Sequence, residues 1–85
     1  MIEEDIGAQT EQAIRNLQEI LRAAGTNLDR VVKTTVFLQD MAHFSAMNEV
    51  YGTYFADSPP ARSTIAVAAL PLGALVEIEA VALLE

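Results

Sequence analysis

Residues 31–38 form the segment that most restricts how this chain can fold. Six of the eight side chains are β-branched or aromatic, in the order VVKTTVFL. Such side chains fit a pleated sheet better than a helix, so the segment predicts a β-strand. The even positions are the more apolar ones, and we expect them to lie under helices: Val32, Thr34, Val36 and Leu38. Lys33, Thr35 and Phe37 then lie on the opposite face.

The segment before this strand has helical periodicity. Between residues 5 and 24 apolar side chains recur at spacings of three and four, which indicates an amphipathic helix with one buried stripe. The stripe consists of Ile6, Ala13, Ile14, Leu17, Ile20, Leu21 and Ala24. Gly25 follows as a left-handed stop.

A second helix is predicted after the strand, with Asp40 as its N-cap. Its stripe consists of Met41, Phe44, Met47, Val50, Tyr51, Tyr54 and Phe55. A stripe rich in Met and aromatic residues can be interpreted as a cofactor pocket, but packing against a sheet is its ordinary role. Residues 56–60 end the helix, because proline disfavours helical dihedral angles in the residue before it.

The last third of the chain predicts two more strands around a turn at residues 71–74. The first, residues 62–70, is small and apolar after Arg62, and the second alternates, with Glu77 and Glu79 on one face. The expected fold class is α+β in the order α-β-α-β-β, with two helices on one face of the sheet. A sheet of so few strands is lopsided under two helices, so we expect further strands from another chain or from a fuller version of the fold.

Composition narrows the possible classes of function. The 85 residues predict a single domain, 1–85, and 52% hydrophobic side chains exceed what it can bury, which predicts a subunit interface. A net charge of −7 with five Lys and Arg argues against nucleic acid or an anionic membrane as partner. The absence of cysteine excludes a thiol nucleophile and suits the cytoplasm. We expect neither a membrane span nor an N-terminal targeting signal.

Arg62 and Glu77 are the candidates for chemistry. Arg62 follows a rigid Pro-Pro-Ala segment, and an arginine fixed there can hold a carboxylate by two parallel hydrogen bonds; the alternative is a solvated strand-end arginine. Glu77 is interpreted either as part of a solvated face with Glu79 or as a general base or water holder.

The turn decides whether these two candidates share a sheet face. In a hairpin, a four-residue turn puts Arg62 and Glu77 on the same face, and a three-residue turn puts them on opposite faces. Even on the same face, Glu77 lies opposite Ala68, about 20 Å along the strand from Arg62. A site that uses both residues is therefore expected between subunits.

Two other polar side chains have ordinary interpretations. Asn48 is expected on the surface of the second helix. His43 is the only histidine, with no partner suited to a metal site or a catalytic triad, and we expect it to be exposed. Gly-rich phosphate loops, nucleophile elbows and paired-cysteine zinc motifs are absent.

Four segments taken together resemble the RidA/YjgF/UK114 family: residues 31–38 (VVKTTVFL), 47–51 (MNEVY), 60–64 (PARST) and 76–82 (VEIEAVA). The first helix fits as well, and the resemblance covers essentially the whole chain. It implies a chorismate-mutase-like fold, a homotrimer around a barrel of sheets, and ligand sites between subunits.

The resemblance also implies an activity. RidA-type members hydrolyse 2-imino and 2-enamino acids to 2-keto acids and ammonia, without metal or cofactor. By this resemblance Arg62 holds the substrate carboxylate, Glu77 positions the hydrolytic water, and Thr64 and Asn48 line the pocket. An imine is already electrophilic, so orientation and one activated water suffice.

The chain departs from the family in two ways. Family chains begin with three strands ahead of the first helix, which carry a pocket Tyr and a Gly-containing stretch, and we expect this shortened sequence to lack that wall. Thr64 stands where many relatives carry Cys. The alternative function is therefore a catalytically impaired protein that keeps the Arg62 clamp and binds small carboxylates or a partner. A ribonuclease, described for some relatives, fits the acidic charge poorly.

Overall fold

The structure is a computed structural model, and it describes residues 5–84. The described residues form two α-helices and three strands, in the order α1 (Ile6–Ala23), β1 (Val31–Leu38), α2 (Phe44–Tyr54), β2 (Ala61–Ala66) and β3 (Val76–Ala82). The predicted α+β class and element order are confirmed. The expectation that the N-terminus carries no targeting signal concerns residues 1–4, which lie outside the described residues.

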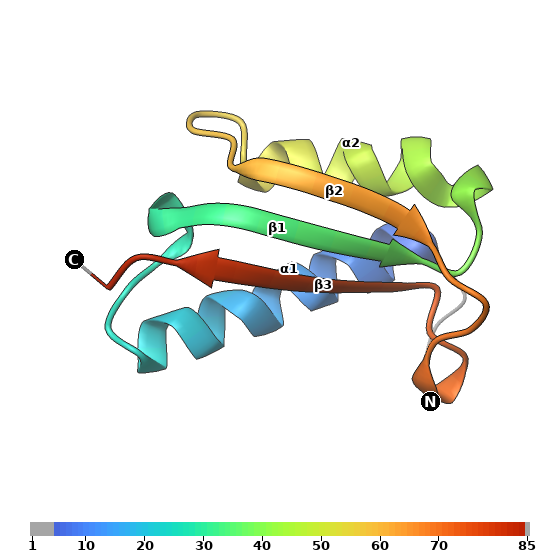
Figure 1. Cartoon of the computed structure of the whole chain (residues 1–85), viewed down its shortest axis with the longest axis horizontal. Helices are drawn as coiled ribbons and strands as arrows, with labels where there is room; N and C mark the ends of the chain where they lie inside the picture. The colour runs from blue at the N-terminus through green and yellow to red at the C-terminus, as the bar shows by residue number, and fades with distance from the viewer. Residues whose placement is uncertain (1–4, 85) are drawn as a thin grey trace.

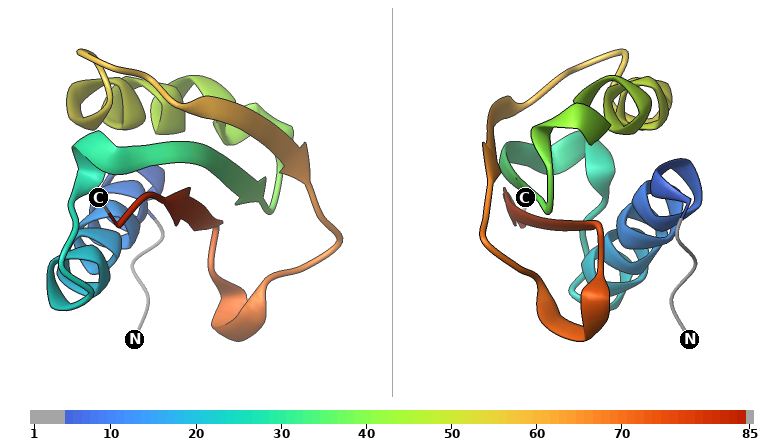
Figure 2. Two further views of the ribbon diagram at one scale, coloured as in Figure 1. Left: turned by 60° about the vertical axis from the view of Figure 1, so that its left-hand side comes forward. Right: turned by 90° about the vertical axis from the view of Figure 1, so that its right-hand side faces the viewer.

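Both helices cover one face of the sheet. Figure 1 looks onto the other, helix-free face, and the right-hand view of Figure 2 separates the strands from the two helices. In the described chain the sheet has three strands in the order β2-β1-β3. β1 is parallel to β2 and antiparallel to β3, so the segment with the strongest strand signal occupies the centre.

The predicted hairpin of β2 and β3 is wrong, because the two strands lie on opposite sides of β1. β2 ends at Ala66, short of the predicted residue 70, and the connection passes round the end of β1 (Figure 1). Backbone hydrogen bonds hold this connection against β1, from Val67 N to Leu38 O at 2.9 Å and from Gln39 N to Leu75 O at 3.0 Å. The central strand thereby pairs along both of its edges.

The connection between β2 and β3 contains a tight turn. Pro71 has no backbone N–H to donate. Leu72 and Gly73 adopt positive φ angles of 59° and 71°, outside the extended region. Residues 71–73 form a 3-10 turn that redirects the chain instead of continuing either strand.

The alternation of β1 is interrupted at its start. Three even positions are buried as predicted: Thr34, Val36 and Leu38. Val32, however, is 44% exposed, and Val31 takes the buried place at 5%. The pairing with β3 has a register irregularity between Val31 and Lys33, which shifts the side chains there by one position.

The core lies between the sheet and the two helices. It consists of Ile14, Leu21, Val31, Val36, Leu38, Met47, Tyr51, Phe55, Val76 and Ile78. The predicted stripe of the first helix is correct at Ile14 and Leu21, but wrong at Ile20, which is 63% exposed, and at Ala24, which is exposed. Thr10 is buried in addition, and its hydroxyl donates to Ile6 O at 2.7 Å, so a polar residue enters the core with its hydrogen bond made.

The helix ends follow local side-chain chemistry. Asp5 caps α1 by accepting from Gly7 N and Ala8 N, and Gly25 ends it with a φ of 89°, as predicted. Asp40 caps a 3-10 turn, Met41–His43, through Ala42 N, so α2 begins later than predicted. His43 is half-buried rather than exposed.

Gly52 and Gly25 give opposite predictions for the same substitution. A Cβ on either residue meets nothing within 4 Å, but Gly25 has a φ of +89° and Gly52 lies inside α2. We expect Gly52→Ala to raise the free energy of unfolding by about 0.5–1 kcal/mol, since alanine is the better helix former. Gly25→Ala is expected to lower it by about 1 kcal/mol. Urea denaturation measures both changes, and shifts of equal sign would contradict the backbone account.

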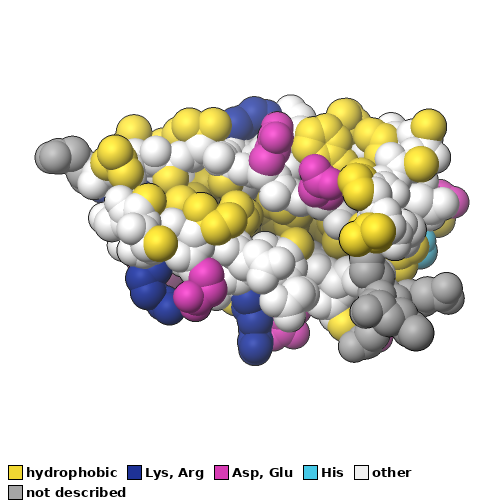
Figure 3. Space-filling view, turned by 90° about the horizontal axis from the view of Figure 1, so that it is seen from below, with side chains coloured by type: hydrophobic (Ala, Val, Ile, Leu, Met, Phe, Trp, Pro, Cys, Tyr) yellow, Lys and Arg dark blue, Asp and Glu magenta, His cyan; other side chains and the backbone are white. Residues whose placement is uncertain are grey.

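The free edge of β3 is apolar. Figure 3 views this side from below and shows hydrophobic side chains gathered between acidic side chains and the charged surface of the helix. α1, β3 and the residues after β3 carry the exposed apolar side chains Ile20, Val81, Leu83 and Leu84. Such an edge suits burial by another segment or subunit, and the subunit interface stays a prediction. Within residues 5–84 neither helix has the length and apolar character needed to cross a bilayer.

Candidate functional site

The side chain of Arg62 lies on the helix face of the sheet, against α2. Arg62 pairs in register with Thr34, which is buried under the helices, and paired residues present their side chains to the same face. The Arg62 guanidinium carbon lies 4.7 Å from the ring centroid of Tyr51 and 5.3 Å from that of Phe44. Both distances are typical of cation–π contacts. The arginine at this strand is therefore held, and half-buried, rather than freely solvated.

Asn48 completes the cradle around this guanidinium. Arg62 Nη1 donates to Asn48 Oδ1 at 2.6 Å. Phe44, Asn48 and Tyr51 follow one another on α2 at spacings of four and three, which places them on one stripe of the helix. Asn48 is exposed, as the sequence predicted, but it has a specific partner. The helical spacing of two aromatic rings around an amide was the signal that sequence reasoning missed.

Arg62 has no carboxylate partner in the described chain. The ion pairs found among residues 5–84 are Arg15–Glu11 and Arg22–Glu19, both on α1. A guanidinium carries five N–H donors, and the described residues accept from it at Asn48. The remaining donors, in a planar fork, suit an added carboxylate.

Thr64 lies two residues beyond Arg62 on the same face. It pairs in register with Val36, a fully buried residue. The Thr64 hydroxyl oxygen is buried, and no hydrogen-bond partner for it is found among the described residues. A buried hydroxyl without a partner is uncommon and costs about 1–3 kcal/mol, so this position stands out beside the cradle.

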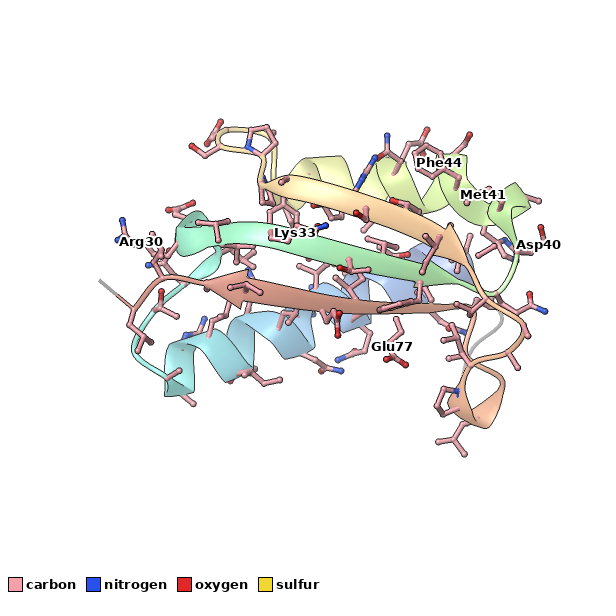
Figure 4. All side chains as sticks on the ribbon, in the orientation of Figure 1. Arg30, Lys33, Asp40, Met41, Phe44 and Glu77 are labelled. Atoms are coloured by element: carbon pink, nitrogen blue, oxygen red, sulfur yellow. The ribbon has the colours of Figure 1, made fainter. Side chains whose placement is uncertain are left out.

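Glu77 lies on the opposite face of the sheet. It pairs in register with Phe37 on the helix-free face and is exposed, as is Glu79. Figure 4 shows Glu77 beside β3 and Phe44 on α2, on opposite sides of β1. The register offsets Arg62 and Glu77 by about 10 Å along the strands and about 10 Å across them. One chain therefore does not bring them together, because the sheet itself separates them.

The helix-free face carries Lys33 among both polar and apolar side chains. Lys33, labelled near the middle of the sheet in Figure 4, donates from Nζ to Ser63 Oγ at 2.8 Å. Ser63 pairs with Thr35, which in turn pairs with Glu79. This face combines hydroxyl groups, carboxylates and an ammonium, and no sequence pattern singled it out.

A separate cavity of about 340 Å³ opens between the helices, away from all the predicted site residues. It is lined by Gln18, Arg22, Thr26, Asn27, Leu28, Asp29, Thr53 and Tyr54. Its arginine, Arg22, is already paired with Glu19 at 2.9 Å. Arg62, whose charge has no such partner in the described residues, is therefore the better candidate for binding an anion.

Glu11, Arg15 and Tyr54 join the two helices beside that cavity. Tyr54 donates to Glu11 Oε2 at 3.2 Å, and Arg15 donates to the same oxygen at 3.1 Å. A side-chain hydrogen bond with Tyr54 and the charge of Glu11 raise the pKa of Arg15 above its ordinary value. Arg15 therefore stays positively charged at ordinary pH values, and the three side chains connect α1 to α2. Among residues 5–84 no three His, Cys, Asp or Glu side chains come together as a metal site requires.

Comparisons with known proteins point to one group of sequences. The profile of the family described as Endoribonuclease L-PSP matches residues 1–84. The 2-iminobutanoate/2-iminopropanoate deaminase of Mus musculus is 57% identical over 74 residues, which cover 87% of this chain and 55% of the relative. The chloroplastic Reactive Intermediate Deaminase A of Arabidopsis thaliana is 51% identical over 83 residues, 98% of this chain and 44% of the relative.

Solved structures share the fold. The crystal structure of E. coli TdcF with bound serine aligns with a TM-score of 0.91 at 36% identity, over 96% of this chain and 67% of that one. This likeness confirms the fold that the sequence resemblance implied. The chain spans about half the length of the mouse and Arabidopsis relatives.

Proposed function

The chain belongs to the Endoribonuclease L-PSP family, which includes the RidA/YjgF proteins, and we propose that it hydrolyses reactive 2-imino and 2-enamino acids to 2-keto acids and ammonia. Two relatives named as deaminases, one of them for 2-iminobutanoate and 2-iminopropanoate, support this proposal. Those two substrates are small and each carries a carboxylate. E. coli TdcF is described with bound serine, which also carries one.

The observation that carries the proposal is the uncompensated charge of Arg62. Its guanidinium is half-buried between two aromatic rings and an amide, with no carboxylate of residues 5–84 in ion-pair contact. A cation held in this way favours an anionic ligand, and the planar fork favours a carboxylate over a monodentate anion. The substrate carboxylate is therefore proposed to bind at Arg62, with Asn48 and Thr64 beside it.

The proposed chemistry needs water as its only co-reactant. The imine carbon is electrophilic, and water adds to the C=N bond with one proton moving to nitrogen. The hydroxyl proton of the resulting aminol then passes to nitrogen, the C–N bond breaks as C=O forms, and ammonia leaves the 2-keto acid. Glu77 is proposed to orient the attacking water and accept its proton, which is general base catalysis. No metal and no cofactor take part in the proposed reaction.

An oligomer follows from the placement of Arg62 and Glu77. They lie on opposite faces of one sheet, so a pocket that uses both draws Glu77 from a neighbouring copy. We propose the homotrimer that the family resemblance implies, located in the cytoplasm. The exposed apolar side chains of the sheet and its free edge, among them Ile65, Val81 and Leu84, supply surface for such an assembly.

The proposal is tested by the release of ammonia from imino acids that an amino-acid oxidase generates. The wild-type chain is expected to accelerate release above the uncatalysed rate, and Arg62→Ala is expected to return it to that background. Arg30→Ala is the matched control, because Arg30 is exposed and lies outside the cradle. Background rates for wild type and Arg62→Ala alike would overturn the hydrolase. A monomer at all concentrations would overturn the intersubunit pocket.

A second candidate is a carboxylate-binding protein without turnover. Its supporting observation is that the Arg62 cradle is complete within one chain, whereas Glu77 is not part of it. Binding of 2-ketobutanoate without accelerated hydrolysis would favour this candidate. Ribonuclease activity, which the family description names, is less favoured here, because five Lys and Arg and a net charge of −7 suit RNA poorly.

A further inference from the structure

We infer that Tyr51 is a positioning residue, which fixes the plane of the Arg62 guanidinium through a hydroxyl anchor on the central strand. The inference rests on the proposed function, because it explains how Arg62 is held in place to bind the substrate carboxylate. Tyr51 is 5% exposed, so it acts on the ligand through Arg62 and not by direct contact.

The anchor is a buried hydrogen bond between two hydroxyl groups. Tyr51 Oη and Thr34 Oγ1 lie 2.7 Å apart, and Thr34 is fully buried. A tyrosine hydroxyl in a core needs a partner, and this bond supplies it for both residues. The bond fixes the ring of Tyr51 relative to β1, and the Phe55 ring packs against the same ring at 4.5 Å between centroids.

Thr34, Tyr51 and Arg62 each contact the other two, and these contacts connect β1, α2 and β2. Thr34 on β1 is the register partner of Arg62 on β2, and the side chain of Thr34 holds Tyr51 of α2. The ring of Tyr51 in turn lies 4.7 Å from the Arg62 guanidinium carbon. Thr34 therefore supports Arg62 in two ways, through the strand pairing of the backbone and through the ring of Tyr51 that it holds.

The position of Arg62 makes such bracing useful. β2 is an edge strand with one neighbour in the described chain, and an arginine there has many rotamers to lose on binding a ligand. Holding the planar fork before the ligand arrives reduces that loss, which is preorganisation. Asn48 also holds Arg62, but it is exposed, and no hydrogen bond from it to the core is found among residues 5–84, whereas Tyr51 is bonded to β1.

The test separates positioning from mere stability. Tyr51→Phe and Thr34→Val each remove one end of the hydroxyl pair while keeping the ring and the side-chain shape. Each is expected to weaken binding of 2-ketobutanoate about fivefold and to increase the motion of the Arg62 Nε–H bond in ¹⁵N relaxation. The double variant, with both partners apolar, is expected to regain thermal stability but not the order of Arg62 or the affinity.

The matched control is Tyr54→Phe, which removes the other tyrosine hydroxyl of α2, bonded to Glu11. It is expected to leave both the motion of Arg62 and the affinity unchanged. Unchanged Arg62 motion in folded Tyr51→Phe would overturn the inference, as would recovery of Arg62 order together with stability in the double variant. A wild-type chain that binds no 2-ketobutanoate would overturn the proposed function instead, because Arg62 motion is measured without ligand and still decides the role of Tyr51.

Discussion

Arg62→Lys is expected to lower kcat/KM for a 2-imino acid by about 100-fold, although it keeps the positive charge. Lysine presents a compact ammonium on a flexible stem, so it loses the parallel pair of hydrogen bonds to the carboxylate. It also loses the flat contact with the rings of Tyr51 and Phe44, which are 4.7 and 5.3 Å from the Arg62 guanidinium carbon. Hydrogen bonds to charged groups contribute about 1.5–3 kcal/mol each, which sets this magnitude.

The control for this substitution is Arg30→Lys, at an exposed residue of the 3-10 turn before β1, with no change expected. Steady-state kinetics on oxidase-generated imino acids provides the measurement for both variants. A loss below about threefold in Arg62→Lys would show that charge alone binds the carboxylate. Equal losses in the two variants would show that the effect is one of overall charge and not of the cradle.

Ile14→Ala is expected to lower the free energy of unfolding by about 2–5 kcal/mol. Ile14 is fully buried in the core between α1 and the sheet, so the truncation leaves a cavity. A loss of this size is a large part of the stability of a small domain, which is about 5–15 kcal/mol. Urea denaturation at a fixed protein concentration measures it, and Ile14→Val, expected to cost about 1 kcal/mol, serves where the alanine variant does not fold.

Ile20→Ala is the matched control, because it is the same substitution on the same helix. Ile20 is 63% exposed in the single chain, so its truncation is expected to cost less than about 1 kcal/mol at a protein concentration where the chain is a monomer. Similar costs at the two positions would contradict the orientation of α1. Both residues belong to the stripe predicted from periodicity, so the pair tests the structure where periodicity alone cannot discriminate.

The elements of the fold were predictable because their signals are local. The β-branched run of β1 and the alternation of β3 are properties of short segments, and both strands form where expected. Gly25 ends α1 because its left-handed conformation is a property of that residue. The wider stripe on α1 failed at Ile20, since the sheet covers only part of the apolar arc that the spacing defines.

The roles of the candidate residues followed from resemblance, and their environment did not. The sequence singled out Arg62 but left open whether it is solvated, because this depends on the distance between α2 and β2. Phe44 and Tyr51 were assigned to the core stripe, and only their packing against the edge strand makes them partners of a cation. The roles of Arg62 and Glu77 in the proposed reaction stay predictions.

The sequence by itself determined that Arg62 lies near the start of a strand, that Glu77 alternates with apolar neighbours, and that two helices cover a sheet. These facts depend on the conformational preferences of a few consecutive residues. Only the tertiary structure decided that β1 separates β2 from β3, and that the register of these two strands on β1 puts Arg62 and Glu77 on opposite faces. Strand order is set by long-range hydrogen bonds along both edges of the central strand, and no local pattern encodes which edge each strand takes.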